Sequence, residues 1–305
     1  MKSASTRLLA AATVACAGTF CTPAAFAQGT FNAAAAGDEC NPTGSATNTY
    51  ASVTCTAIGS VGVSLQAWGF TGNALSASPQ IGFQRGTLGD FNSSGFGAYT
   101  GNLETSATGQ HGFDNVTSGC GTTAAPTATG VTLATGCGGS IEALFLDFGA
   151  AKVNLTNIGI GWSGADADLS VWAWTGAGAA NMSNTQASGS TTTLGTTAAT
   201  LSGWTLVSNH AFAGNTITSQ TANTNGTLYS SYFLVTTYFG AQVVGSLTAG
   251  NDSFKLNSFT AGLCTGTLSG ATCTPGRVSE PGSVALAGLA LVGLFASRRK
   301  VRALF

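Results

Sequence analysis

The chain has 305 residues, only 7% of them are charged, and its formal net charge at pH 7 is −1. Soluble domains usually carry about 25% charged residues, so salt bridges contribute little to the stability of this fold. Of its ten Lys and Arg residues, four lie in residues 28–278, against ten Asp and Glu, which gives this body a net charge near −6. Nucleic-acid binding requires clustered basic residues and is therefore excluded as a function.

The first 27 residues have the pattern of a secretory signal peptide with a signal helix. Two basic residues precede an apolar run at 8–20, and Ala25-Phe26-Ala27 gives the small-x-small pattern of a cleavage site. We therefore expect signal peptidase to release a mature chain that starts at Gln28. A lipoprotein alternative would acylate Cys16, but Thr13 stands where leucine is normally required.

Between the two ends, short alternating runs bounded by Gly, Asn, Ser and Thr replace helical periodicity. At 169–174, Leu, Val and Ala alternate with Ser170, Trp172 and Trp174, which places the two sets on opposite faces of a strand. About ten such strands predict an all-β domain over 28–278, a jelly-roll-like two-sheet β-sandwich. The clearest runs are 61–68, 142–148, 153–160, 169–174, 204–208, 228–239 and 253–260.

Two stretches of this domain look inserted. Residues 119–140 are rich in Gly and Thr, and residues 176–200 are rich in small and polar side chains with few large ones. We expect the second stretch to form a mobile loop or a decorated hairpin.

Six cysteines fall into three pairs that are close in sequence. In an oxidising compartment this spacing favours the disulfides Cys40–Cys55, Cys120–Cys137 and Cys264–Cys273. Six cysteines allow 15 connectivities, so the local pairing is a preference among them. A metal site is not expected from these cysteines, because the body has no C-x-x-C motif and its two histidines are isolated.

Residues 279–305 form a short tail with an apolar span at 284–296, which we expect to be a transmembrane helix. As a helix this span is roughly 20 Å long, less than the ~30 Å hydrocarbon core of a bilayer. Arg298, Arg299 and Lys300 follow the span and stay on the cytoplasmic side by the positive-inside bias. The span is therefore better suited to temporary than to permanent anchoring.

This tail resembles the PEP-CTERM signal, which an exosortase recognises and removes. Glu280, Pro281 and Ser283 fit the signal, as do Arg298 and the basic residues after it, while Ser279 replaces the usual first proline. The resemblance implies an exosortase-type sorting protease as a partner and an intermediate anchored in the inner membrane of a Gram-negative bacterium. It also implies that the product reaches the cell surface or extracellular matrix, in contact with exopolysaccharide.

A second resemblance covers about residues 105–260. An ordered series of short motifs is similar to that of exosortase-dependent surface proteins, a family for which no activity is established. This resemblance implies an exported β-rich surface domain and no reaction. The motifs are His111-Gly112-Phe113-Asp114-Asn115, 144–148, 160–162, 166–171, 203–204, 230–235 and 252–256.

Asp166 and Asp168 are the candidate metal ligands. They follow a Gly-containing turn and precede a strand, so both carboxylates could face a Ca²⁺ ion whose other ligands are backbone carbonyls. The alternative, which we favour, is that Asp166 caps the turn and Asp168 bonds nearby backbone amides. We expect no other cofactor.

Catalytic candidates are weak, and we do not expect an enzyme. His111 with Asp114 and Asn115 forms a polar cluster without a nucleophile motif. A glycosidase needs two opposed carboxylates, and the acidic residues Glu104, Glu142 and Asp147 do not reveal from sequence whether they converge.

Four tryptophans decide between the remaining functions. Trp162, Trp172, Trp174 and Trp204 could stack against sugar rings, or they could lie in a core, as Trp usually does. We expect a non-catalytic exported surface or matrix protein that associates with exopolysaccharide. The alternatives are a carbohydrate-binding or adhesin module and a matrix hydrolase.

Overall fold

The computed structural model describes the central part of the chain. The described residues are 28–33, 38–40, 49–58, 61–69, 83–91, 94–99, 112–114, 142–164, 167–188, 200–212, 220–224, 226–238, 243–244, 247–248 and 252–274. All of them belong to one compact unit, Phe26–Gly276. The predicted signal peptide at 1–27 and the tail at 279–305 lie outside the described residues.

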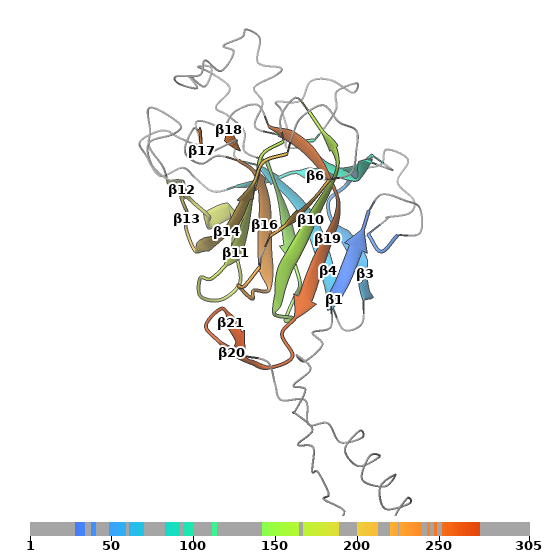
Figure 1. Ribbon diagram of the computed structural model, residues 1–305. Coiled ribbons are helices and arrows are strands. Elements are labelled where there is room, and N and C mark those ends of the chain that lie inside the picture. The colour runs from blue at the N-terminus through green and yellow to red at the C-terminus, as the bar shows by residue number, and fades with distance from the viewer. Residues whose placement is uncertain are drawn as a thin grey trace, which may run out of the picture. The chain divides into compact units, whose positions relative to one another are not determined.

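Two antiparallel sheets make up the fold (Figure 1). Sheet A has eight strands in the order β15-β10-β19-β7-β6-β2, with β1 and β8 also paired to β19. Its strands are β1 (Gln28–Asn32), β2 (Thr49–Tyr50), β6 (Thr87–Asp90), β7 (Phe96–Tyr99), β8 (Phe113–Asp114), β10 (Val153–Ser163), β15 (Gln220–Asn223) and β19 (Ser253–Leu263).

Sheet B has seven strands in the order β14-β11-β16-β9-β4-β3, with β5 also paired to β4. Its strands are β3 (Val53–Ile58), β4 (Val61–Gly69), β5 (Gln84–Arg85), β9 (Glu142–Asp147), β11 (Leu169–Trp174), β14 (Trp204–His210) and β16 (Tyr232–Thr237).

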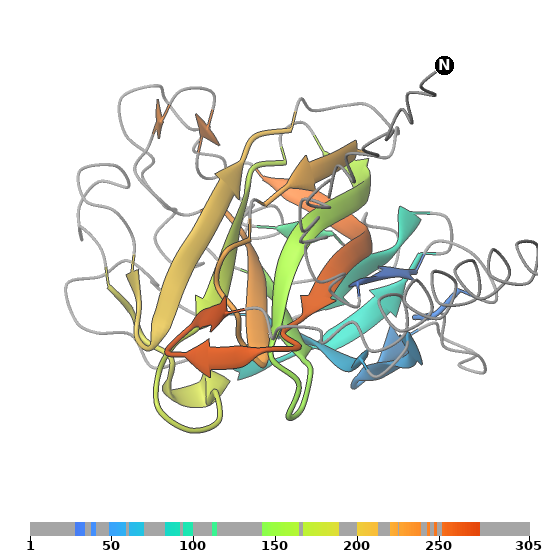
Figure 2. The same cartoon turned by 60° about the horizontal axis from the view of Figure 1, so that its bottom comes forward.

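Three two-stranded hairpins complete the described elements, together with the short 3-10 helix η2 (Met182–Asn184). Figure 2 shows the fold turned so that the last hairpin, β20–β21, comes forward. The hairpins are β12 (Ala187–Ser188) with β13 (Thr200–Leu201), β17 (Val243–Val244) with β18 (Leu247–Thr248), and β20 (Thr267–Ser269) with β21 (Thr272–Thr274).

The main core lies between the two sheets. Strands of sheet A contribute Phe31, Phe254 and Phe259, and strands of sheet B contribute residues such as Leu144 and Leu169, all at most 1% exposed. Phe31 and Phe259 come from paired positions on β1 and β19, and their rings stack with centroids 5.0 Å apart. The predicted all-β domain is therefore confirmed, while its jelly-roll connectivity stays a prediction.

The predicted strands are found at or near their expected positions. The largest shift is in the run expected at 228–239, where the strand β16 begins only at Tyr232. Just before it, Ser230 pairs with Val153 of β10 in an isolated bridge. The Ser231 carbonyl accepts the amide of Phe148, the residue after β9, and so continues the pairing of β9 with β16. The strand β16 therefore begins two residues after Ser230, whose partner Val153 belongs to sheet A.

A second, smaller core covers the outer face of sheet B. The alternation on β11 places Leu169 in the main core and Trp172 on the opposite face, as expected, yet Trp172 is also buried. Residues 176–188 and the hairpin β12–β13 supply Met182 and Leu201 to cover it, and Phe83 joins them. The segment expected to be a loop or decorated hairpin is thus, where described, a packed hairpin, and it buries the strands β9, β11 and β16 of sheet B on their outer face as well.

Within the described residues, no helix is long and apolar enough to cross a membrane. The predicted signal helix and transmembrane helix fall in segments outside this part of the chain, so both stay predictions.

Candidate functional site

The outer face of sheet A carries cross-strand rows of uncharged polar residues. The core residues of β10 and β19 point inward, so their partners in the alternation point outward, and directly paired residues share a face. We call this surface the polar face. Its three rows are Thr221–Gly159–Ser258–Asn32, Asn223–Asn157–Thr260–Thr30 and Asn154–Gly262–Gln28.

Hydrogen bonds between side chains order this polar face. The Thr30 and Thr260 hydroxyls lie 3.0 Å apart, and the Gln28 side-chain amide donates to the Thr156 hydroxyl at 2.9 Å. A Cβ at Gly159 would lie 2.1 Å from the Ser258 hydroxyl oxygen, so a larger residue there would displace the Ser258 side chain. The result is a regular array of amides and hydroxyls, which matches the chemistry of a hydroxyl-rich ligand.

One end of sheet A carries an aromatic and cationic group. On β10, Trp162 is half-buried and pairs with Lys255 of β19. The Lys255 ammonium lies 4.9 Å from the centroid of the Trp162 ring and 3.9 Å from that of Phe91. Sequence reasoning counted Lys255 as a charge and as part of the motif at 252–256, but assigned it no site. The available signal was a lone lysine within an alternating apolar strand of a chain that has so few charges.

The other predicted tryptophans lie in or beside the second core. Trp172 and Trp204 are 4% and 7% exposed, and Trp174 is packed against this core with its indole N–H donating to the Gly178 carbonyl. Trp172 and Trp204 therefore offer no open face to a sugar ring. Among the four candidates, Trp162 is the one that stands apart from the second core and beside the polar face.

The candidate calcium ligands are only partly described. Asp166 lies outside the described residues, whereas Asp168 is fully buried and its backbone amide donates to the Asp252 carboxylate at 2.8 Å. This bond joins the start of β11 in sheet B to the start of β19 in sheet A. Asp252 is the residue that sequence reasoning missed here, since 84 positions separate it from Asp168.

The Asp168 and Asp252 carboxylates also affect the pKa of the nearby Tyr238 phenol. Burial raises the pKa of Tyr238, and the charges of Asp168 and Asp252 raise it further. Among the described residues, no group of three or more His, Cys, Asp and Glu is arranged to hold a metal ion. The calcium site at Asp166 and Asp168 stays a prediction.

Of the carboxylates considered for catalysis, Glu142 and Asp147 are described, and both lie on strand β9. Glu142 is 1% exposed at the start of β9, and Asp147 at its end accepts the backbone amide of Gly149. Their Cα atoms are roughly 16 Å apart along the strand, and the odd spacing of five residues sends the two side chains to opposite faces of the sheet. Glycosidases instead need two carboxyl groups that face each other across about 5–9.5 Å. Glu104, His111 and Asn115 lie outside the described residues.

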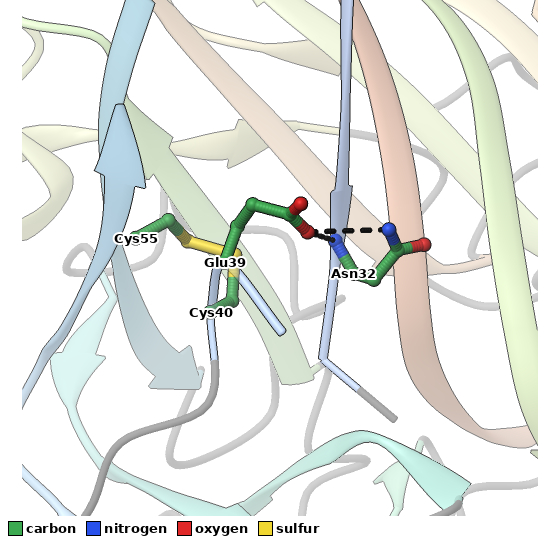
Figure 3. Close-up of a disulfide and its surroundings, with 4 residues drawn as sticks. All are labelled: Asn32, Glu39, Cys40 and Cys55. Carbon is green, nitrogen blue, oxygen red and sulfur yellow. Dashed lines mark hydrogen bonds between the residues drawn. A yellow bond between two sulfur atoms is a disulfide. The ribbon is translucent and has the colours of Figure 1, made fainter. Parts of the chain in front are cut away.

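Two of the three predicted disulfides are confirmed, Cys40–Cys55 and Cys264–Cys273. Cys120 and Cys137 lie outside the described residues. Next to the first disulfide, the Glu39 carboxylate accepts both the backbone amide of Asn32 at 3.0 Å and its side-chain amide at 3.2 Å (Figure 3). Backbone hydrogen bonds to this carboxylate lower the pKa of Glu39. The disulfide and Glu39 together fix the edge strand β1 beside the polar face.

Comparison with known proteins gives a match for one segment of the chain. A family model described as the PEP-CTERM protein-sorting motif matches residues 277–300, so the chain carries the tail of a PEP-CTERM sorted protein. No curated protein and no solved structure matches the chain. The motif implies export, a membrane-anchored C-terminal sorting intermediate and processing by an exosortase.

Proposed function

We propose that this chain is a non-catalytic surface or extracellular-matrix protein that associates with exopolysaccharide after an exosortase has processed its tail. The observation that carries the proposal is the sorting motif at 277–300, because it implies the export route. Disulfides form and persist in oxidising compartments outside the cytoplasm. The Cys40–Cys55 and Cys264–Cys273 bonds support the same route.

The polar face supports the polysaccharide part of the proposal. It presents amide and hydroxyl groups from four adjacent strands, β15, β10, β19 and β1, without a charged residue in its rows. Such a surface can exchange hydrogen bonds with sugar hydroxyls along an extended chain. A matrix protein needs many weak contacts of this kind rather than one deep pocket.

A carbohydrate-binding or adhesin module is the second candidate. The half-buried Trp162 beside the polar face favours it, because one aromatic face gives a sugar ring a defined position. A matrix hydrolase has less support, since Glu142 and Asp147 lie too far apart along β9 to act on one glycosidic bond.

The route can be tested in cells with and without the sorting protease. We expect the protein from normal cells to lack its tail by mass spectrometry and to be found outside the inner membrane. Without the protease, the tail should persist and the protein should stay with the membrane fraction. A mature protein that keeps its full tail in both strains contradicts the proposed route.

A pair of tail variants sharpens this experiment. Replacing Glu280 and Pro281 together with Ala removes two of the residues that fit the sorting signal, so the tail should persist even in normal cells. The matched control is Ser279→Ala, at the position where this chain already departs from the signal, and it should be processed normally. Equal processing of both variants would mean that another segment directs the protease.

A further inference from the structure

Lys255 is a buried cation on the outer face of sheet A. Its neighbours Phe254 and Leu256 point into the main core, so the Lys255 side chain points outward, yet the residue is only 6% exposed. Two aromatic rings cover it, Trp162 from the paired strand β10 and Phe91 from the turn that follows β6. The ammonium lies against the π faces of both rings, an arrangement that attracts a cation electrostatically.

The turn that brings Phe91 to this position is fixed by close backbone approach. The Phe91 amide donates to the Gly95 carbonyl at 3.1 Å. Gly95 has a φ of 87°, and a Cβ there would lie 2.2 Å from the Leu256 carbonyl oxygen. A Cβ at Gly161 would lie 2.6 Å from the Ser94 carbonyl oxygen. Because two glycines let this turn press onto β10 and β19, the aromatic cage around Lys255 is a built feature of the fold.

The positive charge in this cage has no anionic partner in the described part of the chain. Burial lowers the pKa of Lys255, and no neighbouring charge contributes to the change. An ammonium has three N–H donors, and the contacts observed for Lys255 are the two aromatic rings. Burying a charge without a counter-ion is costly. A carboxylate supplied by a ligand would offset this cost and accept the N–H groups.

We propose that Lys255, Trp162 and Phe91 form a subsite for the carboxylate of an acidic sugar unit in a polysaccharide. The Lys255 ammonium binds the carboxylate, and the half-buried Trp162 ring lies against the sugar. Neighbouring sugar units lie along the polar face, whose nearest row contains Ser258, roughly 10 Å from Lys255 along β19. This inference rests on the proposed association with exopolysaccharide and names the class of sugar. An acidic peptide is less suited, because the adjoining rows offer hydroxyl and amide groups rather than apolar pockets.

Binding of the full-length chain in detergent to a galacturonic acid oligomer tests the proposal by calorimetry. The comparison ligands are the same oligomer with its carboxyl groups reduced to alcohols, and a glutamate peptide of equal charge. We expect the acidic oligomer to bind at least tenfold more tightly than either comparison ligand. Equal binding of the reduced oligomer would overturn the role of the carboxylate. Equal binding of the peptide would overturn the assignment to a sugar.

Two lysine variants locate the subsite. Lys255→Met removes the charge and keeps an unbranched chain of similar length, so affinity for the acidic oligomer should fall by about thirtyfold or more. The matched control is Lys152→Met, at an exposed lysine, and it should bind like the wild type. Lys255→Met should also melt no lower than the wild type, because it removes a buried charge. Unchanged affinity in the folded Lys255→Met protein would overturn the proposal.

Two further measurements complete the test: the affinity of Trp162 variants for the acidic oligomer, and the processing of the tail in cells. Trp162→Ala should lose most of the affinity and Trp162→Phe should retain part of it, because phenylalanine keeps a ring at this position. Tail processing in cells is followed by mass for each variant. Normal processing with no acidic-sugar binding would refute this subsite and leave the export route standing, whereas a persistent tail in normal cells would refute the route.

Discussion

Replacing Trp204 with Ala tests whether the outer face of sheet B has a real second core. Trp204 is 7% exposed, and its indole N–H donates to the Thr185 hydroxyl at 3.1 Å. Its ring meets Phe145 and Trp174 edge to face, with centroids 6.2 and 5.4 Å apart. These contacts join strand β14 to β9, to β11 and to the covering segment that contains Thr185.

The expected cost follows from these contacts. Removing a buried aromatic side chain costs about 3–5 kcal/mol of unfolding free energy, of which the hydrogen bond to Thr185 accounts for about 1 kcal/mol. Trp204→Phe keeps much of the ring contact but loses the hydrogen bond to Thr185, so it should cost about 1 kcal/mol of unfolding free energy. For a domain of this size, about 2–4 °C of Tm is lost per kcal/mol, so Trp204→Ala should lower Tm by about 6–20 °C.

Urea unfolding followed by fluorescence and circular dichroism measures these differences. The matched control is Leu206→Ala, two residues further along β14 on the same face but 41% exposed, and it should change stability by less than about 0.5 kcal/mol. If Trp204→Ala and Leu206→Ala cost the same, residues 176–188 do not form a core with sheet B and our interpretation of this face is wrong.

Three further predictions concern what the disulfides, the protonation of His210 and calcium contribute to stability. Replacing Cys40 and Cys55 with Ser should cost about 3 kcal/mol, slightly more than replacing Cys264 and Cys273, because the first pair closes the longer loop; the reverse order in urea unfolding would contradict this loop argument. Burial lowers the pKa of His210 below 6.5, so the unfolded chain binds a proton more readily than the folded one, and stability should fall as pH drops from about 6.5 through the folded-state pKa. His210→Gln should flatten this slope in melts between pH 7.5 and 5, and an unchanged slope would assign it to other groups. If Asp166 and Asp168 bind calcium, EDTA should lower Tm and added Ca²⁺ restore it, whereas an unchanged Tm removes the site.

Much of the fold was predictable because alternation is a local signal. The runs around Val61, Val153 and Leu169 show which side chains share a face, and the cysteine pairs are close enough in sequence to suggest their partners. Whether a face is covered depends on distant segments. Nothing near Trp172 indicates that Met182 and Phe83 pack over it.

The candidate sites were less predictable for the same reason. The Asp168–Asp252 bond joins the starts of two strands in different sheets, and the cage around Lys255 needs Phe91 from a separate turn. The polar face depends on the registers of four strands, and one of these, β1, is far from the others in sequence. The sorting motif was recognisable because its residues are contiguous.

The position of the last hairpin determines how the fold would carry mechanical load. Strand β21 ends at Thr274, and the sorting motif begins at 277, so tension applied through the tail enters the fold at this hairpin. The Cys264–Cys273 bond passes that tension directly to the end of β19, bypassing the residues between the two cysteines. Because β19 lies between β10 on one side and β1, β7 and β8 on the other, pulling along it shears many hydrogen bonds at once instead of unzipping them singly. A protein held by its C-terminal side would therefore resist drag through the strand with the most neighbours.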